Sequence, residues 1–471
     1  MKTLQRCLLS AVQAALAVAR RVLPAPVMRR LSGRASAIVA AISTPVGASF
    51  ENRATALKDV APILPPSAFA QGQILFANAA LAWGGAERQL VNTMTGLAKR
   101  GVASSLLCLR LHEDSDLDFF VSALADHNGF VRNAMAATQG ETSLSRASPA
   151  HLERLRAAIA WLPLDVQADI FRFAGEFAAL KPSVVHAWQD ATSIAAGYAA
   201  RLIGVPRMIL SARSVAPANF HYQRPYMADA YRELCDCPSV VLLNNSEAGA
   251  SDYARWLGIA KERIVVLRNG FDADAVRRPD DGERNALRDK LGIPMGAPVV
   301  GTIIRFSPVK QPMLWAATAA NVARARPDCH FVIFGTGPLR EDVIAFAKRE
   351  GFADRLHCPG TIVNVAAGLS LFSVFLLTSQ VEGTPNVVLE ASLLGIPVVA
   401  TAVGGTAETL VQGETGFAVE PAADRLATAV LAALNDPATA ERASRQGPAF
   451  VRQRFGLSRM LDETLALYHR A

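Results

Sequence analysis

The sequence predicts an α/β protein with two Rossmann-like domains that face each other across a cleft, preceded by a basic N-terminal arm. Its 471 residues, 51% of them hydrophobic, exceed what one core usually serves and suit two domains. From residue 73 onward, strand-like apolar runs alternate with helical runs, which is typical of parallel sheets covered by helices. Residues 184–210 and 375–401 repeat one order: strand, polar loop, helix, Gly-x-Pro, strand.

The basic character of the chain is concentrated at its N-terminus. Residues 1–50 hold seven of the 48 basic residues and no acidic residue, which leaves 41 basic residues against 41 acidic ones in the rest. A nucleic-acid-binding protein more often carries its excess charge on a folded face. The six cysteines form no C-x-x-C pair, so neither a zinc site nor a disulfide framework is indicated.

Residues 1–34 are expected to contact a membrane surface. Apolar residues from Leu4 to Val22 recur at helical spacing with basic residues between them, but they form no uncharged run of the ~18 residues that a membrane span needs. A basic amphipathic helix on an anionic membrane fits this pattern, and a loosely ordered extension fits it equally well. Residues 35–72, rich in Ala, Ser and Pro, resemble a linker.

The first Rossmann-like domain is assigned to residues 73–272. Its predicted strands are 73–81, 103–111, 182–189, 205–213, 239–246 and 263–270, with helices at 86–101 and 193–204. Residues 112–180 look mostly helical. Residues 269–283 are the expected hinge.

The second Rossmann-like domain is assigned to residues 273–471, with the last helix expected to pack back on the first domain. Its predicted strands are 298–306, 330–337, 355–360, 372–379, 397–403 and 416–419. Because ligands of open parallel sheets bind at the carboxyl ends of the strands, the site is expected in the cleft between the domains.

A helix start near residue 384 is the predicted anion site. Thr384 is a favourable N-cap and Pro385 a favourable first helical residue, and Gly395 follows the expected last residue, Leu394. Free amide groups at this helix start would attract a phosphate, and Gly383 would allow its close approach.

Two glutamates flank that predicted anion site. Glu382 precedes the turn and Glu390 lies almost two turns along the helix. A carboxylate only accepts hydrogen bonds, so a sugar hydroxyl at Glu382 and a ribose diol at Glu390 would suit them. A nucleotide-sugar carries phosphate, sugar and ribose in one molecule.

Cations and glycines complete the predicted site. Arg305 and Lys310 follow the first strand of the second domain and could offset charge that builds on a departing diphosphate. Gly335 and Gly337 follow the next strand and are expected to form a close-packed loop beside the nucleotide. As a dinucleotide fingerprint this loop is weak, because Arg340 stands where a third glycine would be.

Together these residues resemble retaining glycosyltransferase family 4, the GT-B enzymes known as group 1, over residues 74–470. The motifs that carry the resemblance are E-x7-E from Glu382 to Glu390, G-x3-R-x4-K from Gly301 to Lys310, "GTGP", "GIPVVATAVGGTAE", "GGAERQ" at 84–89 and "LRNGFD" at 267–272.

The resemblance implies a UDP- or GDP-linked sugar as substrate, no cofactor, and transfer with retained anomeric configuration and no bound metal. The donor would lie on the second domain and a glycan or lipid-linked glycan acceptor on the first. Arg305 and Lys310 would hold the diphosphate, Glu382 the donor sugar and Glu390 the ribose. The remaining implied donor contacts are Gly383, Thr384, Pro385, Asn386, Val387, Gly335 and Gly337, and Gly84 and Gly85 would line the phosphate and acceptor side. His186 falls where the family often has His-x-His, although Trp188 takes the second place.

Family members of this kind act in bacterial exopolysaccharide, capsule or lipopolysaccharide assembly, which implies a cytoplasmic enzyme, peripheral on the inner face of the cell membrane if the arm binds there. Two alternatives remain open: a GT-B nucleotide-sugar epimerase or phosphorylase, and a non-catalytic protein that binds sugar nucleotides. D-x-D spellings at 114–118 and 272–274 lie in predicted loops, where turn chemistry explains them better than metal binding.

Overall fold

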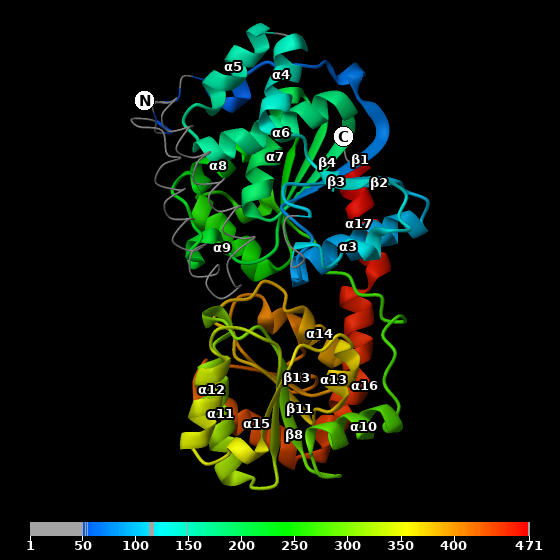
Figure 1. Cartoon of the computed structure of the whole chain (residues 1–471), viewed down its shortest axis with the longest axis vertical. Helices are drawn as coiled ribbons and strands as arrows, with labels where there is room; N and C mark the ends of the chain where they lie inside the picture. Colours follow the sequence, from blue (N-terminus) through cyan, green and yellow to red (C-terminus); the bar gives the residue numbers. More distant parts are fainter. Residues whose placement is uncertain (1–49, 52, 54, 113–116, 148, 470–471) are drawn as a thin grey trace.

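The computed structural model describes residues 50–469, except for 52, 54, 113–116 and 148, and contains two α/β domains, one above the other (Figure 1). Each domain holds one parallel sheet, as the alternation of strands and helices predicts. The predicted membrane-binding arm, residues 1–34, lies outside the described residues.

The sheet of the first domain has seven parallel strands in the order β3-β2-β1-β4-β5-β6-β7. The strand that the sequence does not predict is β3, a three-residue edge strand within the region expected to be helical. Its short run Val-Arg-Asn carries no period that distinguishes it from a loop. The strands are β1 (Ala70–Asn78), β2 (Ser104–Cys108), β3 (Val131–Asn133), β4 (Pro182–Trp188), β5 (Arg207–Ala212), β6 (Val240–Asn244) and β7 (Ile264–Val266).

Helices cover both faces of this sheet. Helix α6 packs on α4 and α7, while α3 lies on the opposite face together with α17 (Figure 1). The region expected to be mostly helical, 112–180, holds its α-helices from Ala137 onward, whereas its described residues before that form short turns and β3. The helices are α3 (Gly85–Lys99), α4 (Ala137–Ala147), α5 (Pro149–Ile159), α6 (Leu164–Leu180), α7 (Asp190–Ile203), α8 (Tyr226–Cys235) and α9 (Glu247–Leu257).

The sheet of the second domain has six parallel strands in the order β10-β9-β8-β11-β12-β13, and each predicted strand is present. They are β8 (Val299–Ile303), β9 (His330–Phe334), β10 (Leu356–Gly360), β11 (Val374–Leu377), β12 (Val398–Thr401) and β13 (Gly416–Val419). The helices are α10 (Asp281–Leu291), α11 (Pro312–Ala325), α12 (Arg340–Arg349), α13 (Val365–Ser370), α14 (Asn386–Leu393), α15 (Ala423–Asn435) and α16 (Pro437–Phe455).

The chain crosses between the domains twice, side by side. The amide of Phe271 donates to Phe455 O at 2.7 Å, and the amide of Leu457 donates to Phe271 O at 2.9 Å. After this second crossing α17 (Leu457–His469) leaves the second domain and packs on α3, where Met460 and Leu461 are buried (Figure 1). The two crossings are therefore joined by hydrogen bonds at the point where the chain passes between the domains.

Part of the predicted linker belongs to the first domain. The described residues between 50 and 69 pack on its helices: Leu57 is fully buried, and its amide donates to the Glu233 carboxylate at 2.7 Å. The amides of Ile63 and Leu64 donate to carbonyls at the end of α7. The linker prediction is therefore wrong for these residues, because isolated apolar side chains in an Ala- and Pro-rich stretch give no periodic signal of burial.

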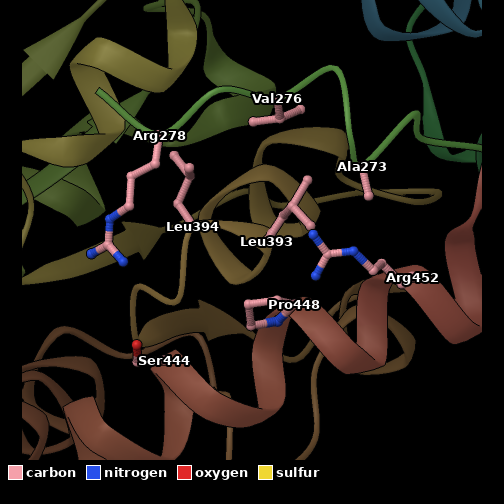
Figure 2. Close-up of a pocket in the computed structure, with 8 residues that line it drawn as sticks. All are labelled: Ala273, Val276, Arg278, Leu393, Leu394, Ser444, Pro448 and Arg452. Carbon is pink, nitrogen blue, oxygen red and sulfur yellow. The ribbon is translucent and has the colours of Figure 1, made fainter. Parts of the chain in front are cut away.

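A cavity of about 200 Å³ lies beneath the first crossing segment (Figure 2). Val276 and Arg278 line it from that segment, Leu393 from the end of α14, and Pro448 and Arg452 from α16. It abuts the C-terminal end of α14, whereas the predicted site is at the start of that helix about 10 Å away.

Candidate active site

The carboxyl ends of both sheets meet where the domains touch. Loops after β1, β5 and β6 face loops after β8, β11 and β12, and several hydrogen bonds join them. A cavity of about 330 Å³ opens between the domains there, lined by Asn219, Ser251, Asp252 and Arg255 of the first domain and by Gln380, Val381 and Gly404 of the second. Polar side chains from both domains therefore border one space.

Helix α14 starts one residue later than predicted, and Thr384 does not cap it. Pro385 takes the N-cap position with φ −70° and ψ 102°, and no side chain accepts from the first turn. Thr384 Oγ1 instead donates across the domain boundary to Asn245 O at 2.8 Å. The N-cap prediction is wrong because a contact with the other domain engages the hydroxyl.

The start of α14 is also covered rather than open to the cleft. A Cβ on Gly383 would lie 2.7 Å from Arg213 O and 2.8 Å from Asn245 Oδ1, so glycine is required here by the close approach of the first domain. Thr384, Pro385 and Asn386 are buried, and Val387 is half-buried. The expectation of freely accessible amides at this helix start is therefore wrong for this closed arrangement.

Lys310 and Glu382 lie together, although 72 residues separate them. Lys310 Nζ donates to Glu382 Oε1 at 2.5 Å, and Ser379 Oγ donates to the same oxygen at 2.5 Å. The amide of Gln380 donates to Val309 O, which ties the two loops to each other. Glu382 is 8% exposed, so its charge is compensated inside the protein by a cation and a hydroxyl.

Arg305 reaches from the second domain to the first. Its Nη2 donates to Trp83 O at 3.3 Å, at the loop that precedes α3. The loop of Gly335 and Gly337 supports it from behind: a Cβ there would lie 1.8 Å from Ile304 O and 2.6 Å from Phe306 O, respectively. Both glycines have positive φ. They are thus required by packing against the backbone that carries Arg305.

Asn386 joins three segments at the domain boundary. Its Nδ2 donates to Gly85 O at 3.0 Å, and its Oδ1 accepts from Asn269 Nδ2 at 2.6 Å. A Cβ on Gly85 would lie 3.0 Å from Asn386 Nδ2. Gly84 and Gly85 therefore bring the start of α3 against the start of α14.

Glu390 is paired with a residue that the sequence does not single out, Arg88 of α3. Arg88 Nη1 lies 2.6 Å from Glu390 Oε1. Burial raises the pKa of Glu390, while the nearby Arg88 guanidinium lowers it. The expected ribose contact is therefore part of a partly buried ion pair between the domains.

Two further polar residues that the sequence did not indicate as site residues are Glu87 and Gln189. Gln189 Nε2 donates to Glu87 Oε1 at 2.7 Å, and burial raises the pKa of Glu87 while hydrogen bonds and Arg305 lower it. Gln189 has φ 65° and ψ 157°, a region that only glycine adopts freely and that costs about 1–3 kcal/mol in other residues. "GGAERQ" contains Glu87, but no sequence signal identifies Gln189 as strained.

His186 is not brought to this group. It lies within β4, is 1% exposed, and its Nδ1 is 2.7 Å from Tyr468 Oη of α17. Burial and the nearby Arg213 lower its pKa to about 3, so it is neutral. The prediction of a catalytic His186 is wrong, because its side chain points under the last helix instead of into the cleft.

Within the described ranges, no helix is long and apolar enough to cross a bilayer. The same residues contain no cluster of three or more His, Cys, Asp or Glu that could hold a metal ion.

Two family models match the chain, one on each domain. "Glycosyltransferase Family 4" matches residues 83–275, and "Glycosyl transferases group 1" matches residues 283–450. The first model contains the Gly84–Gly85 loop, and the second contains Arg305, Lys310, Glu382 and Glu390.

Curated relatives include the Vi polysaccharide biosynthesis protein VipC/TviE of Salmonella typhi, 26% identical over 373 residues. That alignment covers 76% of this chain and 64% of the relative, just under two thirds of its length. The 2-deoxystreptamine glucosyltransferase of Streptomyces kanamyceticus is 29% identical over 289 residues, which cover 59% of this chain and 74% of the relative.

Solved structures share the fold. Anabaena Alr3699/HepE in complex with UDP-glucose superposes with a TM-score of 0.63 at 20% identity, covering 84% of this chain and 99% of that one. A glycosyltransferase from Rickettsia africae ESF-5 gives a TM-score of 0.67 at 16% identity, covering 84% of this chain and 97% of that one.

Proposed function

The chain belongs to the group 1 glycosyltransferases of GT-B fold, and from that premise we propose that it moves a sugar from a nucleotide-sugar to a glycan acceptor in polysaccharide biosynthesis. The observation that carries the proposal lies at the domain boundary: Arg305 contacts the loop that leads into Gly84–Gly85, and Lys310, five residues farther along the same segment, is paired with Glu382. We propose that these cations from one domain and the glycine loop from the other border the place where a diphosphate would depart.

The electrostatic arrangement suits such a departure. Lys310 and Arg305 would supply positive charge where a leaving diphosphate gains negative charge, and the half-buried position of Lys310 would strengthen its interaction relative to water. Glu382 orients Lys310 through its ion pair and could accept a hydrogen bond from a donor hydroxyl. We propose transfer with retained anomeric configuration, the diphosphate remaining on the face from which the acceptor attacks.

We propose a UDP-linked donor, with Glu390 contacting its ribose. HepE, which shares the fold, was solved in complex with UDP-glucose, and this supports uracil as the base of the donor. A carboxylate only accepts hydrogen bonds, so Glu390 suits the two hydroxyl groups of the ribose. In the closed structure Glu390 Oε1 is paired with Arg88, so ribose must use Oε2 or displace Arg88. The relative in Vi polysaccharide biosynthesis supports a growing glycan, free or lipid-linked, as acceptor.

The test is a screen of nucleotide-sugars for release of nucleotide. The kcat of four variants is then measured with the best donor. Lys310→Ala and Glu382→Gln should lower kcat by about 10²–10³-fold, the usual effect of removing one group that stabilises transition-state charge. Lys348→Ala and Glu420→Gln change the same residue types at exposed positions of the second domain and should keep wild-type kcat. Wild-type turnover in both site variants would contradict the proposal.

A second measurement separates transfer from its alternatives. NMR of the product should show the same anomer as the donor, and an inverted product would refute retention. Conversion of the donor sugar to its epimer without acceptor would indicate an epimerase, and phosphate-driven cleavage of a glycan would indicate a phosphorylase.

We also propose that residues 1–34 hold the enzyme at the cytoplasmic face of an anionic membrane, a proposal that rests on the sequence alone. Co-sedimentation with phosphatidylglycerol vesicles should be lost when residues 1–48 are removed. Equal pelleting of both forms would refute it.

A further inference from the structure

Exposed aromatic rings lie at the domain boundary next to the Gly84–Gly85 loop. Phe119 is 52% exposed, and its ring centroid is 6.4 Å from that of Trp83, which is half-buried. Phe120 packs edge-on against Phe119 at 4.9 Å. An exposed phenyl ring beside a half-buried indole offers a stacking surface to a ligand.

The rings belong to two loops that are fastened together. The amide of Leu81 donates to Leu117 O at 2.9 Å, and the amide of Phe120 donates to Leu81 O at 3.0 Å. Arg305 of the second domain donates to Trp83 O. The rings are therefore held in place beside Arg305, one of the two proposed diphosphate cations.

Polar groups adjoin the rings. The Glu87 carboxylate lies against Gly84, since a Cβ on that glycine would be 2.2 Å from Glu87 Oε2. The other oxygen, Oε1, accepts from Gln189, whose backbone is held in its unfavourable conformation by Ser211 O and by the Ser193 amide. A half-buried carboxylate so fixed is a ready acceptor for a hydroxyl.

We propose that Trp83, Phe119 and Glu87 form a subsite for a saccharide ring of the acceptor, with Gln189 as a positioning residue. The C–H face of a pyranose carries partial positive charge and stacks on the negative face of an aromatic ring, while its hydroxyls donate to Glu87. A lipid chain would cover the rings but bring no hydroxyl to donate to Glu87. The inference rests on the proposed function and names the residues that hold a sugar ring of its glycan acceptor.

Binding is tested first by saturation-transfer NMR with methyl glycosides of glucose, galactose, mannose and N-acetylglucosamine, and with decyl phosphate as a lipid probe. The wild type should bind at least one glycoside, and Phe119→Ala should weaken it about tenfold, or ~1.4 kcal/mol. Met295→Ala removes an exposed apolar side chain of the second domain and should bind as the wild type does. Phe119-dependent binding of decyl phosphate without glycoside binding would overturn the proposal.

Kinetics with the best glycoside then separates this subsite from the donor site. Phe119→Ala, Trp83→Ala and Glu87→Gln should raise the acceptor KM about tenfold with less than a threefold change in kcat. Gln189→Gly should raise the same acceptor KM, because it removes the side-chain amide at a backbone position that glycine adopts without strain. Gln189→Glu should also have a raised acceptor KM, because a carboxylate cannot donate a hydrogen bond to Glu87. Unchanged acceptor KM in all four removal variants would refute the subsite alone, whereas a wild type without turnover of any nucleotide-sugar would refute the proposed function.

Discussion

Removing Arg88 should destabilise the protein by leaving Glu390 buried without its cation. The Arg88 and Glu390 side chains are 29% and 11% exposed and their ion pair measures 2.6 Å, so the pair lies between the buried and the exposed limits. Breaking a buried pair from one side costs about 3–5 kcal/mol, and losing an exposed pair about 0–1 kcal/mol. We expect about 2–3 kcal/mol for Arg88→Ala at pH 7.5.

The assay is a double-mutant cycle in urea with Arg88→Ala, Glu390→Gln and the double variant. Since Glu390→Gln replaces the carboxylate with an uncharged amide, adding it to Arg88→Ala should recover part of the loss, with a coupling energy of about 1.5 kcal/mol or more. Equal m-values in all four proteins establish that they unfold in the same transition. A coupling energy below about 0.5 kcal/mol would refute the assignment of Glu390 to a buried pair between the domains.

The dependence on pH gives an independent check. Burial raises the folded pKa of Glu390, so its contribution to stability is fully present below the unfolded pKa and is lost as the pH rises through the folded pKa. Removing Arg88 takes away a group that lowers this pKa. The penalty of Arg88→Ala should therefore shrink between pH 7.5 and pH 5, and a penalty that grows over this range would contradict the pairing.

Three further predictions concern the first domain. Gln189→Ala should lower the free energy of unfolding by about 1 kcal/mol more than Gln189→Gly, because only glycine relieves the backbone at φ 65°; equal values in urea would deny the strain. Between pH 7 and pH 5, the free energy of unfolding of the wild type should fall by about 2 kcal/mol relative to that of His186→Gln. The reason is that a folded pKa of about 3 keeps His186 neutral, while the unfolded residue gains a proton near pH 6.5. A difference that does not depend on pH would show that the imidazole is solvated. Leu57→Ala should cost about 2–5 kcal/mol, since the side chain is fully buried; a loss under 0.5 kcal/mol would mean that residues 50–69 do not belong to the domain core.

The strands and their order of appearance follow from local patterns in the sequence. Apolar runs such as 298–306 and 397–403 can be recognised as strands without knowledge of the strands beside them. They are bounded by Pro and Gly, and a parallel strand that is buried on both faces is mostly apolar. The exceptions lack such a pattern: β3 is too short, and the buried side chains of residues 50–69 are isolated.

The contacts of the site residues are made with segments that lie far away in the chain. The spacing of Glu382 and Glu390 indicates a helix start but not what covers it, and the first domain covers it through Arg213 and Asn245. Arg88 resembles any charged residue of an exposed helix until α3 is placed against α14.

The sequence by itself determined two parallel α/β domains, the loops that carry Lys310 and Glu382, and the family, because these depend on periodicity, turn residues and short motifs within single segments. Only the tertiary structure decided that Thr384 bonds the other domain, that His186 lies under Tyr468, and that Glu87 meets Gln189. Each of these is a contact between segments whose distance in space is set by the packing of whole domains, and such distances leave no local signal in the chain.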